Sequence, residues 1–108
     1  MKSLKDLKAV GGVIPEAPVT KQITFKLDDD QEYTATIHVK RLSIGDHEKL
    51  FAAKLEEGAA SAHLISYAVM LGEDGKERIP FKDAERFHPN LAKAMIDAVQ
   101  EVNEPKKS

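Results

Sequence analysis

The chain has 108 residues with 16 basic and 18 acidic side chains, a formal net charge of −2, and neither cysteine nor tryptophan. This length indicates a single domain, and the lack of cysteine excludes disulfides and thiolate metal sites. Charges of both signs are interspersed, which argues against a nucleic-acid partner or an anionic membrane as partner. No apolar run is long enough for a transmembrane helix or follows the N-terminal lysines as in a secretory signal, so we expect a soluble intracellular protein.

Residues 1–18 are expected to form a flexible leader. Apolar residues recur there at helical spacing among lysines, but Gly11 and Gly12 end any helix. Pro15 and Pro18 then favour an extended chain. The segment is interpreted either as a frayed terminus or as a short amphipathic segment that becomes ordered on a partner.

The next stretch carries the pattern of a β-hairpin with strands at about 19–27 and 31–40. Apolar side chains occupy odd positions in both strands, which gives each strand one apolar and one polar face. Because directly opposed residues share a face, the numbers of a pair must sum to an even value. A three-residue loop ending at Asp30 satisfies this rule and pairs Phe25 with Tyr33, whereas a two-residue turn does not. Such a loop needs a left-handed residue near its end, and aspartate tolerates that conformation.

Helices are expected at 44–57 and at 59–71. Ser43 followed three residues later by Asp46 fits a capping box in its acidic form. Gly58 is placed to follow the end of the first of these helices. The second helix is rich in alanine, which allows close approach of a neighbouring helix.

A turn is expected at 72–75, where two glycines flank an acidic pair. The apolar insert 79–81 is expected to be extended and to fix this turn to the core. One helical turn fits within 82–87. The last helix, 89–103, begins at a proline and shows the clearest amphipathic pattern of the chain.

These elements predict an α+β fold in which a two-stranded antiparallel β-hairpin packs on three to four α-helices. The odd-numbered face of the hairpin is expected to lie against the helices, since an isolated hairpin is marginal in water. We therefore expect a flexible leader at 1–18, a single α+β domain at 19–104 and a disordered tail at 105–108.

The sequence offers no pattern typical of catalysis or of metal binding. No two of the four histidines lie two, three or four residues apart, and the acidic loop before Gln31 lacks the spacing of a calcium loop. No nucleophile elbow, phosphate loop or dinucleotide fingerprint is present. We expect no catalytic residue, no cofactor and no metal, and a protein that binds a partner. The histidines are His38, His47, His63 and His88.

The order of the elements resembles a known family. The resemblance rests on four motifs: the strand-to-helix segment Lys40-Arg41-Leu42-Ser43, the turn Gly72-Glu73-Asp74-Gly75-Lys76, the segment Ile79-Pro80-Phe81-Lys82-Asp83-Ala84 and the terminal Val102-Asn103. In this order and spacing they resemble the small tail assembly chaperones of long-tailed bacteriophages and prophages. The resemblance covers about residues 19–104.

The resemblance implies a non-enzymatic protein of the host bacterial cytoplasm. Such proteins coat and solubilise the long, largely helical tape measure protein before the tail tube polymerises around it. They self-associate, and they are absent from the finished tail. Many are also made as a longer product by ribosomal frameshifting, and Lys106-Lys107 is compatible with a slippery site although any lysine pair would look the same.

A chaperone of this kind needs an apolar surface too modest to precipitate the free protein. The stripes around Leu64 and Leu91 are candidates wherever the core does not use them, and the alternative is that both stripes are core. The candidate partner-binding residues lie in the leader: Leu4, Leu7, Val10, Val13 and Ile14.

Other classes of protein remain as alternatives at this point. The first is a structural tail completion or connector subunit that is retained in the phage particle. A small DNA-binding regulator would need a basic recognition helix, which the sequence does not show. An enzyme without a recognisable motif is the last alternative.

Overall fold

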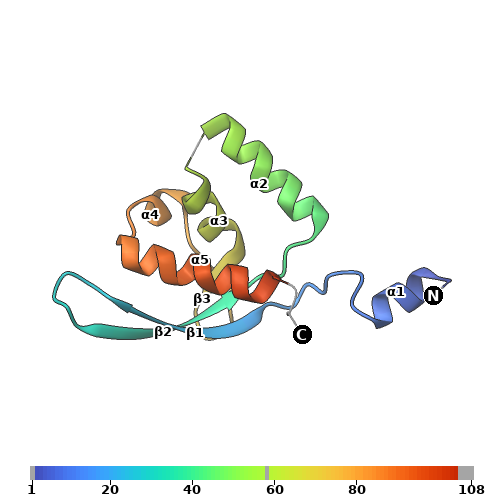
Figure 1. The fold of residues 1–108 in the computed structure, drawn as a ribbon, viewed down its shortest axis with the longest axis horizontal. Coiled ribbons are helices and arrows are strands. Elements are labelled where there is room, and N and C mark those ends of the chain that lie inside the picture. Colours follow the sequence, from blue (N-terminus) through green and yellow to red (C-terminus); the bar gives the residue numbers. More distant parts are fainter. Residues whose placement is uncertain (1, 58, 105–108) are drawn as a thin grey trace.

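The computed structural model describes residues 2–57 and 59–104, with all their side chains except those of 53–57. Gly58, expected to follow a helix end, and the tail 105–108 lie outside the described residues. Figure 1 shows a sheet, helices on one side of it and an N-terminal segment that extends away from the body. The helices are α1 (Leu4–Ala9), α2 (Ile44–Glu57), α3 (Ala60–Ala68), α4 (Phe81–Glu85) and α5 (Pro89–Asn103), and the strands are β1 (Val19–Lys26), β2 (Glu32–Val39), β3 (Val69–Leu71) and β4 (Glu77–Arg78).

The β1–β2 hairpin has the register that the alternation predicts. Phe25 pairs with Tyr33 and Ile23 with Ala35 in an antiparallel ladder. Asp30 adopts a left-handed conformation with φ of 61°, and its N–H donates to the carbonyl of Leu27 at 2.9 Å. The predicted strands are therefore confirmed, with each strand one residue shorter at the loop and β2 one residue shorter at its other end as well.

The core lies between the odd-numbered face of this hairpin and helices α3 and α5. Ile37 and Val39 of β2 are completely buried, and α5 covers the sheet mainly over β1 (Figure 1). The amphipathic stripe of α5 supplies Met95, Ala98 and Val99, all buried. Burying these side chains supplies the cover that the hairpin needs, at about 25 cal/mol for each Å² of apolar surface.

The sheet of the described chain has four antiparallel strands in the order β1-β2-β3-β4. The predicted two-stranded hairpin is therefore only part of the sheet. The helix predicted at 59–71 ends at Ala68, and the next three residues form β3. His38 and Val39 of β2 pair with Met70 and Val69, which extends the ladder across the helix end. This long-range pairing competes successfully with the helical pattern, because Val69 is β-branched and fits a strand.

A glycine turn closes the second hairpin as the sequence indicates. Gly72 and Gly75 adopt φ of 86° and 71°, which only glycine reaches without strain, and the Gly75 N–H donates to the Gly72 carbonyl at 3.2 Å. Beyond β4, Ile79 is buried at 3% exposure and so fixes this turn to the core. The Ser66 hydroxyl donates to the Ile79 carbonyl at 2.8 Å, which holds the insert against α3. The expected helical turn at 82–87 is observed as α4, which ends at Glu85 and begins at Phe81, so the last residue of the insert predicted to be extended is helical.

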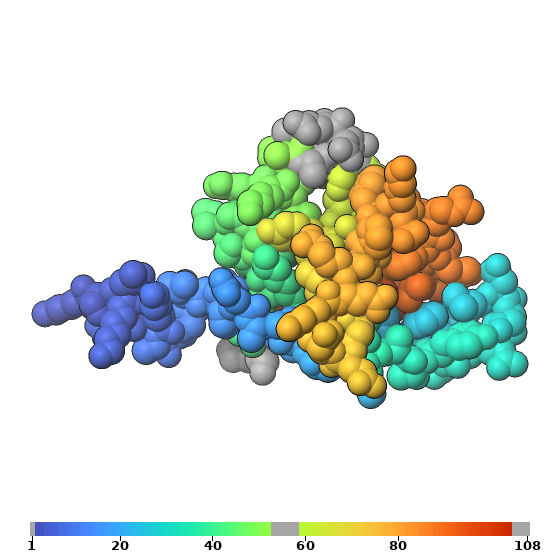
Figure 2. Space-filling view, turned by 180° about the vertical axis from the view of Figure 1, so that it is seen from behind, coloured from blue at the N-terminus to red at the C-terminus, as the bar shows by residue number. Residues whose placement is uncertain are grey.

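The leader contains the short helix α1. Ser3 caps it, because the Ser3 hydroxyl accepts from the Asp6 N–H at 3.2 Å. Gly11 ends it in a left-handed conformation, and the Gly12 N–H donates to the Leu7 carbonyl at 2.7 Å. Figures 1 and 2 show α1 at one end of the molecule, separated from the core by an extended stretch of chain.

Candidate functional site

Large apolar side chains are exposed in three places of the described chain. One is the hairpin tip, where the Tyr33 ring stacks near Phe25 at 6.0 Å between centroids and its hydroxyl donates to Asp29. The second is the α2 face, formed by Ile44 and Phe51, which are 80% and 62% exposed. The third is the leader surface, which comprises Leu4, Leu7, Val10, Val13 and Ile14.

The leader surface presents apolar groups on a segment outside the core. None of the residues of α1 is buried, and Leu4 and Val10 are 61% and 64% exposed. Leu4 and Leu7 lie three residues apart on one side of α1, and Val10 follows as the C-cap residue. The structure thus gives these five candidate residues the exposure that a contact with a partner requires. Their role as partner-binding residues stays a prediction.

The α2 face was not among the surfaces expected from the sequence. Ile44 and Phe51 lie seven residues apart, two turns along the same side of the helix. Alpha2 packs chiefly on α3 and leaves this side to solvent, as Figure 1 shows by the position of α2 away from the sheet. The signal that could have found it was present, because Ile44 and Phe51 have the spacing of an apolar stripe along one side of a helix.

The carboxylate of Asp46 fixes the beginning of α2 to the body. It accepts from the Ser43 N–H at 2.9 Å, and the Ser43 hydroxyl accepts from the Asp46 N–H at 3.3 Å, which confirms the predicted capping box. The same carboxylate accepts from the hydroxyl of Tyr67 on α3 and lies 3.3 Å from the Lys40 ammonium group. The Lys40 ammonium also lies over the Tyr67 ring, 4.9 Å from its centroid.

These contacts shift the two acidic groups in opposite directions. The hydrogen bond from Tyr67, followed by that from the Ser43 N–H, holds the pKa of Asp46 well below its usual range. The bond to Asp46 raises the pKa of Tyr67 above its usual value, with burial adding to the effect. Asp46 is therefore ionised throughout the neutral range, and its charge stabilises the positive end of the α2 dipole.

Asn103 joins the end of α5 to the connection that leads into α2. Its side-chain carbonyl accepts from the Leu42 N–H at 2.7 Å, and its amide donates to the carbonyls of Lys40 at 3.2 Å and Val99 at 2.9 Å. The amide thus acts on residues 40–42 much as a neighbouring strand would. Two motifs that are weak in the sequence, the strand-to-helix segment and the terminal Val102-Asn103, touch each other in the fold.

The stripes around Leu64 and Leu91 belong to the core. Both leucines are half-buried and pack against the cluster formed by Ile65 of α3, Val99 of α5 and their neighbours. The second of the two readings given for the stripes is therefore the one that the structure supports.

The four histidines lie on different elements and have different contacts. His38 lies on the sheet, with Nδ1 3.1 Å from the Thr20 hydroxyl and Nε2 2.9 Å from the Gly72 carbonyl. His63 stacks on Phe81, with ring centroids 4.1 Å apart. His88 caps α5 and pairs with Asp28 at 2.8 Å, and His47 is exposed on α2. In the described part of the chain no three histidine or acidic side chains are grouped as metal ligands would be, and none of its helices has the length and apolar character needed to cross a membrane.

Comparison with known proteins gives one match. A family model described as "Phage tail assembly chaperone, TAC" matches residues 5–103. No curated protein and no solved structure matches the chain. The match includes α1 and extends through α5, so the exposed leader helix and the core are both part of it. The chain belongs to the phage tail assembly chaperone family.

Proposed function

We propose that the chain binds the tape measure protein and keeps it soluble until the tail tube polymerises around it, and that it catalyses no reaction. The observation that carries the proposal is the pair of exposed apolar surfaces, the leader surface and the α2 face, in a chain whose family assembles phage tails. Family membership supports tail proteins as partners, and the tape measure protein is the one whose long apolar helices most need a solubilising cover. In this proposal the protein acts in the cytoplasm of the host bacterium.

The leader 1–18 acts in this proposal as a flexible arm on a domain formed by residues 19–104. Exposed apolar helix faces bind helical partners by burying side chains spaced three, four and seven residues apart. The α1 positions and the pair Ile44 and Phe51 have this spacing. Each face is small, so it does not cause the free protein to precipitate.

Self-association strengthens the binding. One domain of this size buries only a few hundred Å² on a helix, roughly a quarter of a standard stable interface. Weak contacts between neighbouring copies raise the effective concentration at the next site and so reinforce coating. We propose weak, concentration-dependent oligomers, and a longer frameshifted form of the chain as a further member of the assembly.

The test is co-expression of the chain with its tape measure protein, followed by measurement of the soluble fraction and of mass by light scattering. Replacing Leu4, Leu7 and Val10 by serine in the full chain is expected to reduce the soluble tape measure protein severalfold. The double variant Ile44→Ser/Phe51→Ser tests the α2 face in the same assay. Tyr33→Ser is the matched control, since Tyr33 is also exposed but lies at the hairpin tip.

Full solubilisation by both serine variants would contradict the proposed surfaces. Mass spectrometry of purified phage particles separates the proposal from the structural alternative. A chaperone is absent from the finished particle, whereas a completion or connector subunit is present in a fixed copy number.

A further inference from the structure

Strand β1 forms one edge of the sheet in the described chain, and its outward backbone groups can be assigned residue by residue. The Lys40 N–H donates to the Ala68 carbonyl at 2.8 Å, so even-numbered residues of β2 point their backbone groups toward β3. Odd-numbered residues of β2 therefore bond to β1, and by the register they bond to odd-numbered residues there. The N–H and C=O groups directed off the sheet edge belong to Thr20, Gln22, Thr24 and Lys26.

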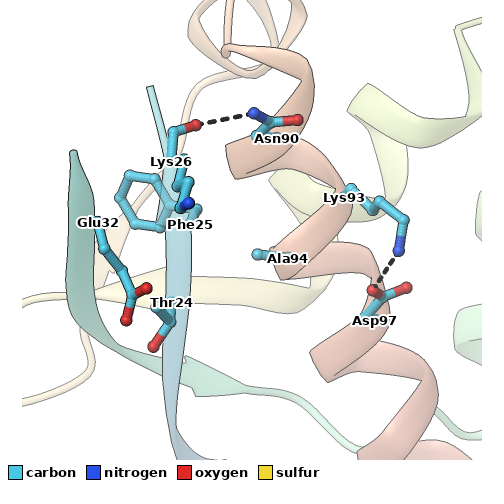
Figure 3. A pocket seen from close by; sticks show the side chains of 8 residues that line it. All are labelled: Thr24, Phe25, Lys26, Glu32, Asn90, Lys93, Ala94 and Asp97. Carbon is cyan, nitrogen blue, oxygen red and sulfur yellow. Dashed lines mark hydrogen bonds and ion pairs between the residues drawn. The ribbon is translucent and has the colours of Figure 1, made fainter. Parts of the chain in front are cut away.

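Helix α5 runs beside this edge and leaves a groove. The Lys26 carbonyl accepts from the Asn90 amide at 2.9 Å, which confirms that Lys26 points outward. Next to this bond lies a cavity of about 370 Å³. Its lining comprises the apolar Phe25 and Ala94 and the polar or charged Thr24, Lys26, Glu32, Asn90, Lys93 and Asp97. Figure 3 shows the Ala94 methyl group pointing toward β1, while the side chains of Lys93 and Asp97, which also line the groove, point away from β1.

The chemistry of the groove selects an uncharged, extended polypeptide. Outward N–H and C=O groups along an edge strand are complementary to another strand, with alternate side chains entering pockets. At this edge the Lys26 carbonyl is already bonded to the Asn90 amide. The lining contains two lysines and two acidic residues, so its charges balance, and Lys93 pairs with Asp97 at 2.9 Å. The partner segment needs no charge of its own, and the small Ala94 allows its backbone to approach closely.

A second copy of the chain does not fit this edge when the two β1 strands pair antiparallel. Its β1 would lie about 4.8 Å away in the extended sheet, and its own α5 would cover the same face. Because α5 packs mainly over β1, the two helices would come much closer than the roughly 8–10 Å that packed helices require. A single extended segment without a covering helix meets no such obstacle.

We propose that the groove between β1 and α5 binds an uncharged, extended segment of a partner protein as a fifth strand of the sheet. Side chains on the α5 side of this segment are small, because Ala94 faces them. Side chains on the other side lie beside Thr20, Gln22 and Thr24, which suits threonine and valine. This groove is separate from the leader surface and the α2 face, so the proposal for it can be tested independently of the proposed tape measure contact.

The probe is the acetylated and amidated peptide Thr-Ala-Thr-Ala-Thr-Ala-Thr, titrated into the full, isotope-labelled chain and followed by amide NMR. Saturable shifts are expected for Thr24, Lys26 and Ala94, together with slower hydrogen exchange at Gln22 and Thr24. Thr24→Pro removes an outward N–H at a position where an edge strand tolerates proline. It is expected to weaken peptide binding by about tenfold or more.

Thr24→Val is the matched control, because it keeps the N–H and the β-branched shape, and it is expected to bind within about twofold of the unaltered chain. Ala94→Leu fills the groove without changing the strand and is expected to weaken peptide binding. It replaces Thr24→Pro as the test if Thr24→Pro lowers the melting midpoint. Equal binding by Ala94→Leu, an absence of saturable shifts, or shifts confined to the leader would overturn the proposal. Dimers in sedimentation that Thr24→Pro dissociates would instead assign the edge to a second copy.

Discussion

Helices α2 and α5 are nearly equal in length and were both expected from the sequence with their observed bounds, yet they have different environments. Alpha5 lies on the sheet and against α3, and it buries Met95, Ala98 and Val99. Alpha2 packs chiefly on α3 and exposes Ile44 and Phe51 to solvent. An amphipathic pattern therefore specifies a helix and an apolar side, whereas the neighbouring elements decide whether that side is core or surface.

The difference assigns separate tasks to the two helices. Substitutions on the inner side of α5 should act on the free energy of unfolding, since the surrounding core is closely packed. Substitutions on the α2 face should act on partner binding and leave the fold intact. The contacts of Asp46 and Asn103 connect the two regions, so changes there should have intermediate effects on stability.

The largest effect is expected from Met95→Ala. Met95 is 3% exposed, and its removal leaves a cavity beneath α5, so we expect a loss of about 2–5 kcal/mol in the free energy of unfolding. Urea denaturation measures this loss. A change below about 0.5 kcal/mol, the size typical of surface sites, would show that α5 is not the core helix.

Asn103→Ala should cost about 1–3 kcal/mol, because it leaves the half-buried N–H of Leu42 without its acceptor. The matched control is Asn90→Ala, which removes a single exposed bond to the Lys26 carbonyl and should cost less. Comparable losses for the two variants would argue that the connection into α2 is not held by Asn103. Faster amide exchange at Leu42 in Asn103→Ala is the accompanying local signal.

Asp46→Asn should cost about 1–2 kcal/mol at neutral pH, where the carboxylate caps α2 and accepts from Tyr67. The folded-state pKa of Asp46 is lowered, so its contribution is present above the unfolded value near 3.9 and is lost as pH falls below it. Melting curves from about pH 6 to pH 2 should therefore bring the two proteins together at acidic pH. A constant difference over this range would contradict the role of the charge.

The smallest effect on stability is expected from Ile44→Ser and Phe51→Ser. Both side chains are mostly exposed, so each substitution should change the free energy of unfolding by less than about 0.5 kcal/mol. The same variants should lower the solubilised tape measure protein in the co-expression assay. A destabilisation as large as that of Met95→Ala would mean that the α2 face is covered by another part of the chain.

Features that depend on neighbouring residues along the chain could be predicted from the sequence. The alternation of apolar residues requires that the numbers of paired residues sum to an even value, and this rule predicts the register of β1 and β2. The three-residue loop that satisfies the rule requires the left-handed conformation found at Asp30. The capping box at Ser43 and the proline at the start of α5 marked helix ends, since capping uses residues three positions apart. The exposure of the leader surface also agrees with expectation, while its partner stays a prediction.

Features that depend on contacts between distant parts of the chain became visible in the fold alone. Val69–Leu71 became β3 because the end of β2 offered unpaired backbone groups at that point, which no local pattern reveals. The amide of Asn103 found the backbone of residues 40–42 across the fold. The α2 face is exposed because α5, and not α2, packs on the sheet. The periodicity within one helix does not indicate which of two amphipathic helices packs there.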